Sequence, residues 1–279
     1  MHVLRDALIE FLREDIGKGD ITCEILPNVK VKAEIICKEK AIVAGIKEVC
    51  ILFELMKCKV KNLVKDGSLV NSNTSIIIVE GNAKVILSIE RTALNILMRM
   101  SGIATETKHL VNEVKKINQN VRITCTRKTS PGFRIFDKKA VEVGGGESHR
   151  IRLDEMVLIK DNHLAIINSI NEAVTKAKEI HHSRSMIEIE VENLEEAIEA
   201  IDAGVNIIML DNLTAKQVRF VVNALKKNGL RNKVKIEVSG GITHKNIKRY
   251  ASVDVDMISI GSITHSVKSV DMSLEIIKT

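Results

Sequence analysis

The sequence predicts an α/β protein in two parts: a mixed α+β domain over about the first hundred residues, followed by an α/β barrel. Two observations indicate this architecture. Beyond residue 120, short apolar runs of β-rich composition alternate with helical stretches, whereas the first hundred residues change pattern often. A chain of 279 residues is long enough for a well-buried core, but its length alone does not choose between one barrel and two smaller domains.

The first part combines helical patterns with apolar runs. In chain order these lie at residues 3–12, 33–37, 46–56 and 75–79. A loop at residues 15–20 carries Asp15 and Asp20 and resembles a metal-binding loop only superficially, because its side-chain ligands are few, so a plain turn is favoured. We expect a separate N-terminal domain with a small open sheet.

The second part begins after a long helical pattern at residues 90–117, which Ser101 and Gly102 could interrupt. Helical patterns at residues 193–203 and 214–227 lie between apolar runs. Nearly all-apolar strands separated by helices are typical of parallel strands covered on both faces, and their steady repetition favours a barrel. The six runs are residues 121–126, 156–159, 186–191, 206–210, 234–238 and 257–260.

Each of these runs ends in polar or glycine residues. In a parallel barrel such ends open onto one face, where active sites are built from the loops that follow the strands. We therefore expect one cleft that combines cations, acids and glycine-containing loops. The cations are Arg127, Lys128, His149, Arg150 and Lys160, the acids are Glu190 and Asp211, and the loops contain Ser239, Gly240 and Gly261.

This set of side chains suits a substrate with carboxylates and phosphates, since arginine pairs with planar oxyanions and lysine acts as a point charge. The acids Glu190 and Asp211 would bind Mg2+, or ribose hydroxyls beside a magnesium-held pyrophosphate. The glycine loops would bind a phosphate through backbone N–H groups. Glu188, Glu190 and Glu192 alternate along one strand, so they share a face, which we expect to be a solvated, inward-facing mouth.

Composition narrows the class of partner. The formal net charge of +6 indicates an anionic partner, but aromatic residues make up only 2% of the chain, too few to stack exposed bases. We therefore expect no nucleic acid. The five cysteines are an odd number without C-x-x-C spacing, which fits a reducing cytoplasm, and no apolar run is long enough to span a bilayer.

Three segments carry a specific family resemblance. They are residues 126–134 (TRKTSPGFR), 144–150 (GGGESHR) and 158–163 (LIKDNH), and in sequence, order and spacing they closely resemble the quinolinate phosphoribosyltransferases, also called carboxylating nicotinate-nucleotide pyrophosphorylases. The resemblance covers nearly the whole chain. It extends to residues 14–17, 90–95, 101–105, 188–192, 210–212, 239–241 and 261–266.

The resemblance implies an N-terminal open-faced α/β sandwich joined to an incomplete α/β barrel. The sandwich would comprise residues 1–102 and the barrel residues 103–265, with a C-terminal helix around residues 266–279 packing back on the sandwich. It also implies a homodimer, in which each active site borrows residues from the neighbouring sandwich domain.

The implied reaction transfers the phosphoribosyl group of phosphoribosyl pyrophosphate (PRPP) to quinolinate, in the presence of Mg2+. Decarboxylation then gives nicotinate mononucleotide, pyrophosphate and CO2, a step of NAD biosynthesis. By resemblance, the pyridine carboxylates bind Arg91 from the partner subunit together with Arg127, His149 and Arg150. The other implied contacts are Lys128 and Lys160 with quinolinate and pyrophosphate oxygens, Glu190 and Asp211 with ribose and magnesium, and Ser239, Gly240 and Gly261 with the 5-phosphate.

The candidate catalytic residues are accordingly Lys128, Lys160, Glu190 and Asp211. Three alternatives stay open at this point. A molybdenum-transport-associated branch of the same family would act on a different substrate, although the segment Lys160 to His163, which varies there, is intact in this chain. A barrel lyase would use Lys160 to form a Schiff base. A non-enzymatic anion binder would follow from the positive charge alone.

Overall fold

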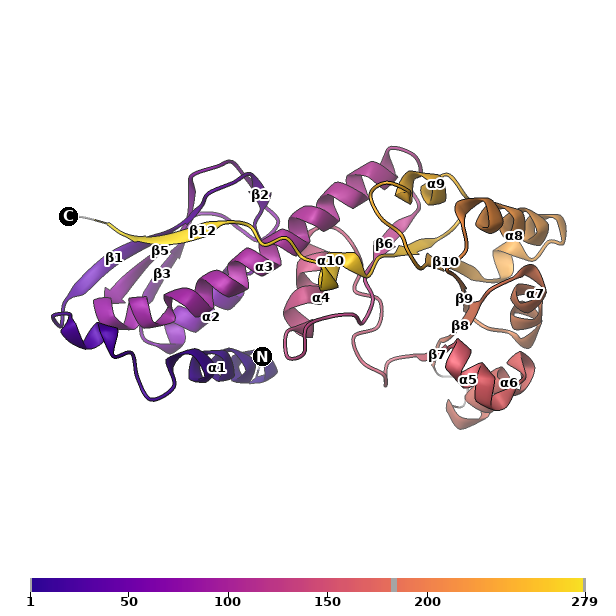
Figure 1. The fold of residues 1–279 in the computed structure, drawn as a ribbon, viewed down its shortest axis with the longest axis horizontal. Coiled ribbons are helices and arrows are strands. Elements are labelled where there is room, and N and C mark those ends of the chain that lie inside the picture. The colour runs from indigo at the N-terminus through magenta and orange to yellow at the C-terminus, as the bar shows by residue number, and fades with distance from the viewer. Residues whose placement is uncertain (1, 182–184, 278–279) are drawn as a thin grey trace. The chain divides into compact units, whose positions relative to one another are not determined.

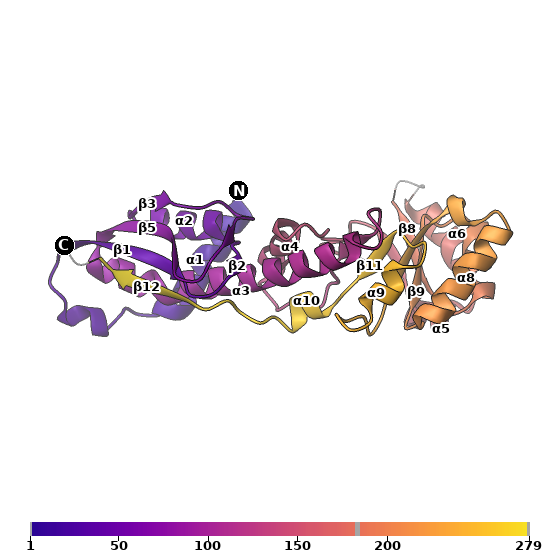
Figure 2. The ribbon, with the colours of Figure 1, turned by 90° about the horizontal axis from the view of Figure 1, so that it is seen from above.

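The computed structural model describes residues 2–181 and 185–277, which divide into two compact units (Figures 1 and 2). Within the described residues, unit 1 comprises residues 2–108, 129–145 and 264–277, and unit 2 comprises residues 109–128 and 146–263. The boundary that the sequence places between residues 102 and 103 falls inside helix α3 (Ala83–Lys115). Residues 129–145, assigned to the barrel from the sequence, group with unit 1.

Unit 1 is built on an antiparallel sheet of four strands in the order β12-β1-β5-β3. These strands are β1 (Lys30–Cys37), β3 (Lys59–Asn62), β5 (Thr74–Asn82) and β12 (Met272–Ile276). Ala33, Ile35 and Cys37 alternate along β1 and are fully buried, so one face of the strand faces the core. Two short strands, β2 (Ala41–Ile42) and β4 (Leu69–Val70), form a separate pair.

The helices α2 and α3 lie beside this sheet in both views (Figures 1 and 2). The helical elements of the unit are α1 (His2–Ile16), the 3-10 helix η1 (Thr22–Ile25), α2 (Ile46–Leu55), most of α3, α4 (Arg134–Val143) and the end of α10 (Ser262–His265).

Helix α3 is continuous through Ser101 and Gly102, so the interruption considered there does not occur. Both small residues serve close packing instead. Ser101 Oγ accepts a hydrogen bond of 3.0 Å from the Ala44 N–H, and a Cβ at Gly102 would lie 2.2 Å from the carbonyl oxygen of Lys268. A glycine inside this helix is therefore explained by a neighbouring backbone, which outweighs its lower helix propensity.

The predicted C-terminal helix around residues 266–279 is wrong. Residues 272–276 form strand β12, which pairs with β1 and places Leu274 opposite Ile35. The segment alternates apolar and polar residues, and this period of two matches a strand better than a helix. The edge of β1 gives it a partner for its backbone groups, which a short terminal helix would lack.

Unit 2 contains a parallel sheet of six strands in the order β6-β11-β10-β9-β8-β7. Its edge strands, β6 and β7, do not pair with each other among the described residues, so the barrel is incomplete. The strands are β6 (Arg122–Thr124), β7 (Val157–Ile159), β8 (Ile187–Val191), β9 (Ile207–Asp211), β10 (Lys235–Ser239) and β11 (Met257–Ser259). All six apolar runs are confirmed as strands.

Helices cover the outer side of this sheet (Figure 1). In succession α6 packs against α7, α7 against α8 and α8 against α9, which is the arrangement expected around a barrel. They are α5 (Asp161–Ile167), α6 (Ile170–His181), α7 (Leu194–Ala203), α8 (Ala215–Lys227) and α9 (Ile247–Ala251), with the 3-10 turn η2 (Arg231–Lys233) before β10. None of the described helices combines the length and apolar content needed to cross a membrane.

The chain before β7 lies against the free edge of β6. Glu147 forms an isolated parallel bridge with Thr124, and the N–H of Cys125 donates to the carbonyl of Glu147 at 3.2 Å. Because this segment follows the edge of the sheet, it brings the next residues, His149 and Arg150, to the carboxyl end of β6. The fold thus adds a loop to the strand ends that form the site.

Candidate active site

A cavity of about 470 Å³ opens at the carboxyl ends of the unit 2 strands. Residues from all six strands, or from the loops directly after them, contribute to its wall, as expected when parallel strands end on one face. The lining residues are Cys125, Thr126, Arg127, Lys128, His149, Arg150, Leu158, Lys160, Asp161, Glu190, Met209, Asp211, Glu237, Ser239 and Ser259.

Two guanidinium groups share one wall of this cavity. Arg150 is buried and donates to the carbonyl oxygen of Met156 at 3.4 Å. Burial, followed by the like charge of Arg127, lowers the pKa of Arg150. Two arginines held close enough to repel each other are stabilised by an anionic ligand, which a planar dicarboxylate would provide.

Lys160 and Glu190 lie at the ends of neighbouring strands, β7 and β8. The Lys160 ammonium donates to Glu190 Oε1, and the lysine side chain is 40% exposed against 13% for the glutamate. The Lys160 backbone is fixed as well, because its N–H donates to His163 Nδ1 at 2.9 Å at the start of α5. The Lys-Asp-Asn-His segment therefore places an ammonium group at the cavity and holds its backbone in place.

Asp211 and Gly240 are coupled through Asn212. The Asn212 amide donates to Asp211 Oδ2 at 2.6 Å, and its N–H donates to the carbonyl of Ser239 at 3.0 Å. A Cβ at Gly240, which has φ +88°, would lie 2.2 Å from Asn212 Oδ1 and 2.7 Å from the Asn212 nitrogen. Only glycine fits at this approach of the β9 and β10 ends.

His149 lies between two fully buried carboxylates. Its Nε2 is 3.0 Å from Glu188 Oε2 and 3.3 Å from Glu237 Oε2. Burial alone would lower the pKa of His149, but the two carboxylates outweigh it and raise that pKa to about 10. Burial also raises the pKa of Glu188, although His149 acts in the opposite direction. His149 is therefore an imidazolium at neutral pH.

The cavity brings together eight of the predicted site residues: Arg127, Lys128, His149, Arg150, Lys160, Glu190, Asp211 and Ser239. Gly240 directly follows the lining residue Ser239 but is not itself among the lining residues. Gly261 follows β11 but is not among the lining residues, and Arg91 lies exposed on α3 in unit 1. The roles of these two residues stay predictions.

Sequence reasoning missed Glu237 and misjudged Glu188. The strand face shared by Glu188 and Glu190 was expected to be solvated, but Glu188 is fully buried, because His149 and Arg150 supply its counter-charge. Glu237 is an acid inside the apolar strand β10 and is also fully buried. An isolated acid within an apolar strand, as in Ile236-Glu237-Val238, was the signal available in the sequence.

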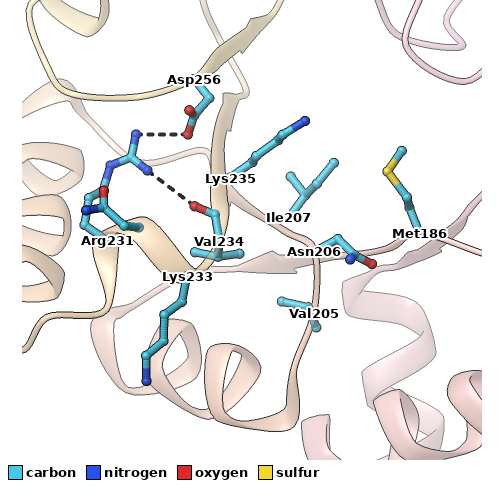
Figure 3. A pocket seen from close by; sticks show the side chains of 10 residues that line it. Met186, Val205, Asn206, Ile207, Arg231, Lys233, Val234, Lys235 and Asp256 are labelled. Carbon is cyan, nitrogen blue, oxygen red and sulfur yellow. Dashed lines mark hydrogen bonds and ion pairs between the residues drawn. The ribbon is translucent and has the colours of Figure 1, made fainter. Parts of the chain in front are cut away.

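A second cavity of unit 2, of about 460 Å³, lies at the amino ends of β8, β9 and β10 (Figure 3). Its arginine is already used within the protein: Arg231 donates to Asp256 Oδ2 at 2.9 Å and to the carbonyl of Val234 at 3.3 Å, as the dashed lines show. Polar groups at this end of a barrel support the fold. The cavity at the carboxyl ends is therefore the stronger candidate.

A cavity of about 390 Å³ within unit 1 is lined by Glu14, Asp15 and Arg99, among others. Here too, Arg99 and Asp15 have internal partners. Arg99 makes two hydrogen bonds of 2.8 Å to Asp137, and Asp15 accepts one of 3.0 Å from the Thr92 hydroxyl. In the loop at residues 15–20, Asp20 accepts a hydrogen bond of 3.1 Å from the N–H of Cys23, which agrees with the plain turn favoured by the sequence.

Comparison with known proteins matches almost the entire chain to one family. Residues 20–101 match the family described as "Quinolinate phosphoribosyl transferase, N-terminal domain", and residues 103–275 match its C-terminal domain. The chain is 46% identical to the "Probable nicotinate-nucleotide pyrophosphorylase [carboxylating]" of Methanocaldococcus jannaschii over 284 residues, covering 99% of both chains. It is 38% identical to the protein of the same name from Bacillus subtilis, covering 98% of this chain and 93% of that one.

The fold agrees with a solved structure of the same kind. The nicotinate-nucleotide pyrophosphorylase from Francisella tularensis superposes with a TM-score of 0.91 at 37% identity, covering 99% of this chain and 96% of that chain. The comparisons give no support to a molybdenum-associated homologue or a Schiff-base lyase. This chain therefore belongs to the quinolinate phosphoribosyltransferase family, a family of α/β enzymes with an open-faced sandwich and an incomplete barrel.

Proposed function

We propose that the cavity at the strand ends binds quinolinate and PRPP and catalyses phosphoribosyl transfer with decarboxylation, giving nicotinate mononucleotide, pyrophosphate and CO2. The observation that carries this proposal is the gathering of two arginines, two lysines and the carboxylates of Glu190 and Asp211 in one cavity of about 470 Å³. A small dianion and a sugar polyphosphate together require this combination of charges.

Quinolinate is assigned to the wall formed by Arg127, His149 and Arg150. Its two carboxylates are planar and adjacent, so they suit guanidinium groups held side by side, and the imidazolium of His149 adds a third cation. A clamp of this kind orients the pyridine nitrogen toward C1 of the ribose. Orientation of the two reactants is the main contribution that binding makes to the first step.

PRPP is assigned to the two lysines, the two acids and the glycine loops. Lys128 and Lys160 would bind pyrophosphate and carboxylate oxygens, Ser239, Gly240 and Gly261 the 5-phosphate, and Glu190 and Asp211 the ribose hydroxyls. Asp211 also fits as a ligand of Mg2+, since it is a hard oxygen donor on the cavity wall whose partner is the neutral amide of Asn212. Bound there, Mg2+ would supply positive charge beside the leaving pyrophosphate.

In the first step the C1–O bond to pyrophosphate breaks and the pyridine nitrogen forms the new bond to C1. The lysines stabilise the negative charge that develops on the leaving group. The nitrogen is now cationic, so when the carboxylate on the adjacent carbon leaves as CO2, its electron pair stays on that carbon beside the positive charge. A proton from water completes nicotinate mononucleotide, and no covalent nucleophile of the protein is needed.

A homodimer is part of the proposal. Arg91 is exposed on α3, has no hydrogen bond or ion pair among the described residues, and does not line the cavity. These properties suit a residue that acts in the active site of a second copy. We also propose a reducing compartment, the cytoplasm, because all five cysteines are free and buried.

One assay tests the reaction directly. The purified protein is incubated with quinolinate, PRPP and Mg2+, and nicotinate mononucleotide, pyrophosphate and CO2 are measured together. We expect equimolar products, and no product when either substrate is omitted. Absence of CO2 release, or consumption of PRPP without quinolinate, would refute the proposed function. Arg152→Ala serves as a control, since Arg152 is an exposed arginine close in sequence to Arg150 but outside the cavity.

A further inference from the structure

A cluster of buried charges adjoins the cavity and consists of His149, Glu188 and Glu237. Both glutamate side chains are fully buried and the His149 side chain is 10% exposed; His149 and Glu237 line the cavity, whereas Glu188 does not. Nε2 of the ring is the atom turned toward the two carboxylates. Since the two nitrogens of imidazole lie on different edges, the edge that carries Nδ1 faces away from the glutamates.

Glu237 is held from two further strands. The Ser259 hydroxyl donates to Glu237 Oε1 at 2.5 Å, and Ser259 Oγ lies 2.5 Å from the Thr124 hydroxyl. A serine hydroxyl has a single proton, which Ser259 gives to the carboxylate, so Thr124 is the donor to Ser259. The carboxylate orientation is thus fixed by β11 and β6, and with it the place available to the imidazole.

Glu188 is compensated by charge. Its carboxylate accepts no hydrogen bond of normal geometry among the described residues, and the cations that act on it are His149 and Arg150. A fully buried carboxylate is strongly destabilising unless a counter-charge accompanies it. The two acids of the cluster thus face two basic groups, His149 and Arg150.

We propose that Glu188 and Glu237 are positioning residues, which hold the His149 ring between them so that its Nδ1–H is a fixed cationic donor for a carboxylate of the pyridine substrate. This inference rests on the proposed function and extends it to two buried residues that act through the His149 ring. The left-handed backbone of His149, with φ +52°, agrees with a side chain whose direction is imposed by its partners.

A metal ion is the competing explanation, because the three side chains offer ligand atoms within 4.8 Å of one another. Arg150 argues against it, since its guanidinium charge acts on the same carboxylate and would repel a cation. Metal analysis separates the two explanations. One equivalent of divalent metal that is present in the purified wild-type protein and absent from His149→Gln would overturn the proposal.

The kinetic test uses Glu188→Gln and Glu237→Gln, each alone and combined with His149→Gln. In the wild-type background we expect each glutamate variant to raise the KM for quinolinate about tenfold while the KM for PRPP changes less than twofold. In the His149→Gln background the same glutamate replacements should raise the KM for quinolinate by less than twofold more, because the ring that the glutamates hold is gone. Losses that are equal in both backgrounds, or equal for both substrates, would overturn the proposal.

NMR of labelled histidine provides a readout that is independent of the reaction. The His149 signal, identified by its loss in His149→Gln, should be that of an imidazolium at pH 8 in the wild type and of a neutral ring in the Glu188→Gln, Glu237→Gln double variant. If the double variant does not fold, the protonation state of His149 is compared between the wild type and each single variant instead. Glu195→Gln, an exposed glutamate of α7, is the matched control.

The two proposals can fail separately. If the wild type produces no nicotinate mononucleotide, the proposed function fails, while the state of the His149 ring still reports on the two glutamates. If the wild type is active but the ring is neutral at pH 8, the positioning proposal alone is refuted.

Discussion

Lys160, at the end of β7, forms an ion pair with Glu190, at the end of the neighbouring strand β8. Both side chains line the same cavity, so the lysine that would bind an anionic substrate begins with an internal counter-ion. An incoming pyrophosphate or carboxylate oxygen must share or replace Glu190. The ion pair with Glu190 keeps the ammonium oriented before substrate arrives. It thereby limits the entropy that is lost when the lysine side chain is ordered on binding.

Replacement of Lys160 should therefore affect catalysis strongly. We expect Lys160→Ala to lower kcat/KM by about 100-fold or more, since a preorganised positive charge near the leaving group is lost. Lys216→Ala, at an exposed position of α8, should leave steady-state kinetics unchanged. Borohydride trapping of substrate on Lys160 would contradict this role and favour Schiff-base chemistry instead.

The two cavity arginines should act on one substrate. Calorimetry with Arg127→Ala and Arg150→Ala should show quinolinate binding weakened by about 1.5 to 3 kcal/mol, the range for hydrogen bonds to charged groups. PRPP binding should change far less. Similar losses for both substrates would show that these arginines do not form a separate quinolinate clamp.

Asp211→Asn tests the carboxylate assigned to Mg2+. Loss of a charged ligand should raise the Mg2+ concentration needed for half-maximal activity by about tenfold or more, measured in a Mg2+ titration at saturating substrates. Asp202→Asn, at an exposed position of α7, is the control. An unchanged Mg2+ dependence would place the metal on other oxygens.

Gly240 and Gly241 provide a matched pair for backbone packing. Both have positive φ, but a Cβ at Gly241 would meet no atom within 4 Å, whereas one at Gly240 would meet Asn212. Gly241→Ala should lower the free energy of unfolding by about 1 to 2 kcal/mol, which is the strain of a left-handed backbone alone. Gly240→Ala should cost about 3 kcal/mol or more in urea unfolding. Equal destabilisation by the two variants would mean that Asn212 can move aside without loss of stability.

The stability of the fold should depend on pH through His149. Its pKa is about 10 in the folded protein against 6.5 for an unperturbed histidine, so the folded state binds the proton more tightly. The resulting stabilisation is complete below pH 6.5 and is lost as the pH rises through 10, with a slope of at most about 1.4 kcal/mol per pH unit. Urea unfolding across this range should show a steeper loss for the wild type than for His149→Gln. Parallel curves would contradict the assigned ionisation.

The parts of the fold that the sequence predicted are those in which one residue pattern has one physical solution. Apolar runs between helical stretches require parallel strands, and the six strands of unit 2 were found within a few residues of their ends. Strand β12 was missed because five alternating residues near the end of the chain carry little signal until the edge of β1 is known. Residues 129–145 could not be assigned to unit 1 for a similar reason, since their grouping depends on tertiary contacts.

The site, like the fold, has residues that could be predicted from the sequence and residues that could not. Arg127, Lys160, Glu190, Asp211 and Ser239 were identifiable because each lies at or directly after a strand end, and strand ends converge in a parallel sheet. Glu237 was not identifiable by this rule, since it lies within its strand. The role proposed for it depends on its contact with His149, which lies in a loop far away in sequence.

Strand β12 has a consequence for the synthesis of the protein. The sheet that it completes begins with β1, yet more than two hundred residues must be translated between the two strands. Until β12 emerges from the ribosome, one edge of β1 has no partner, and an unpaired edge can associate with other nascent chains. The order of elements therefore makes the earliest strand of the chain one of the last to be protected.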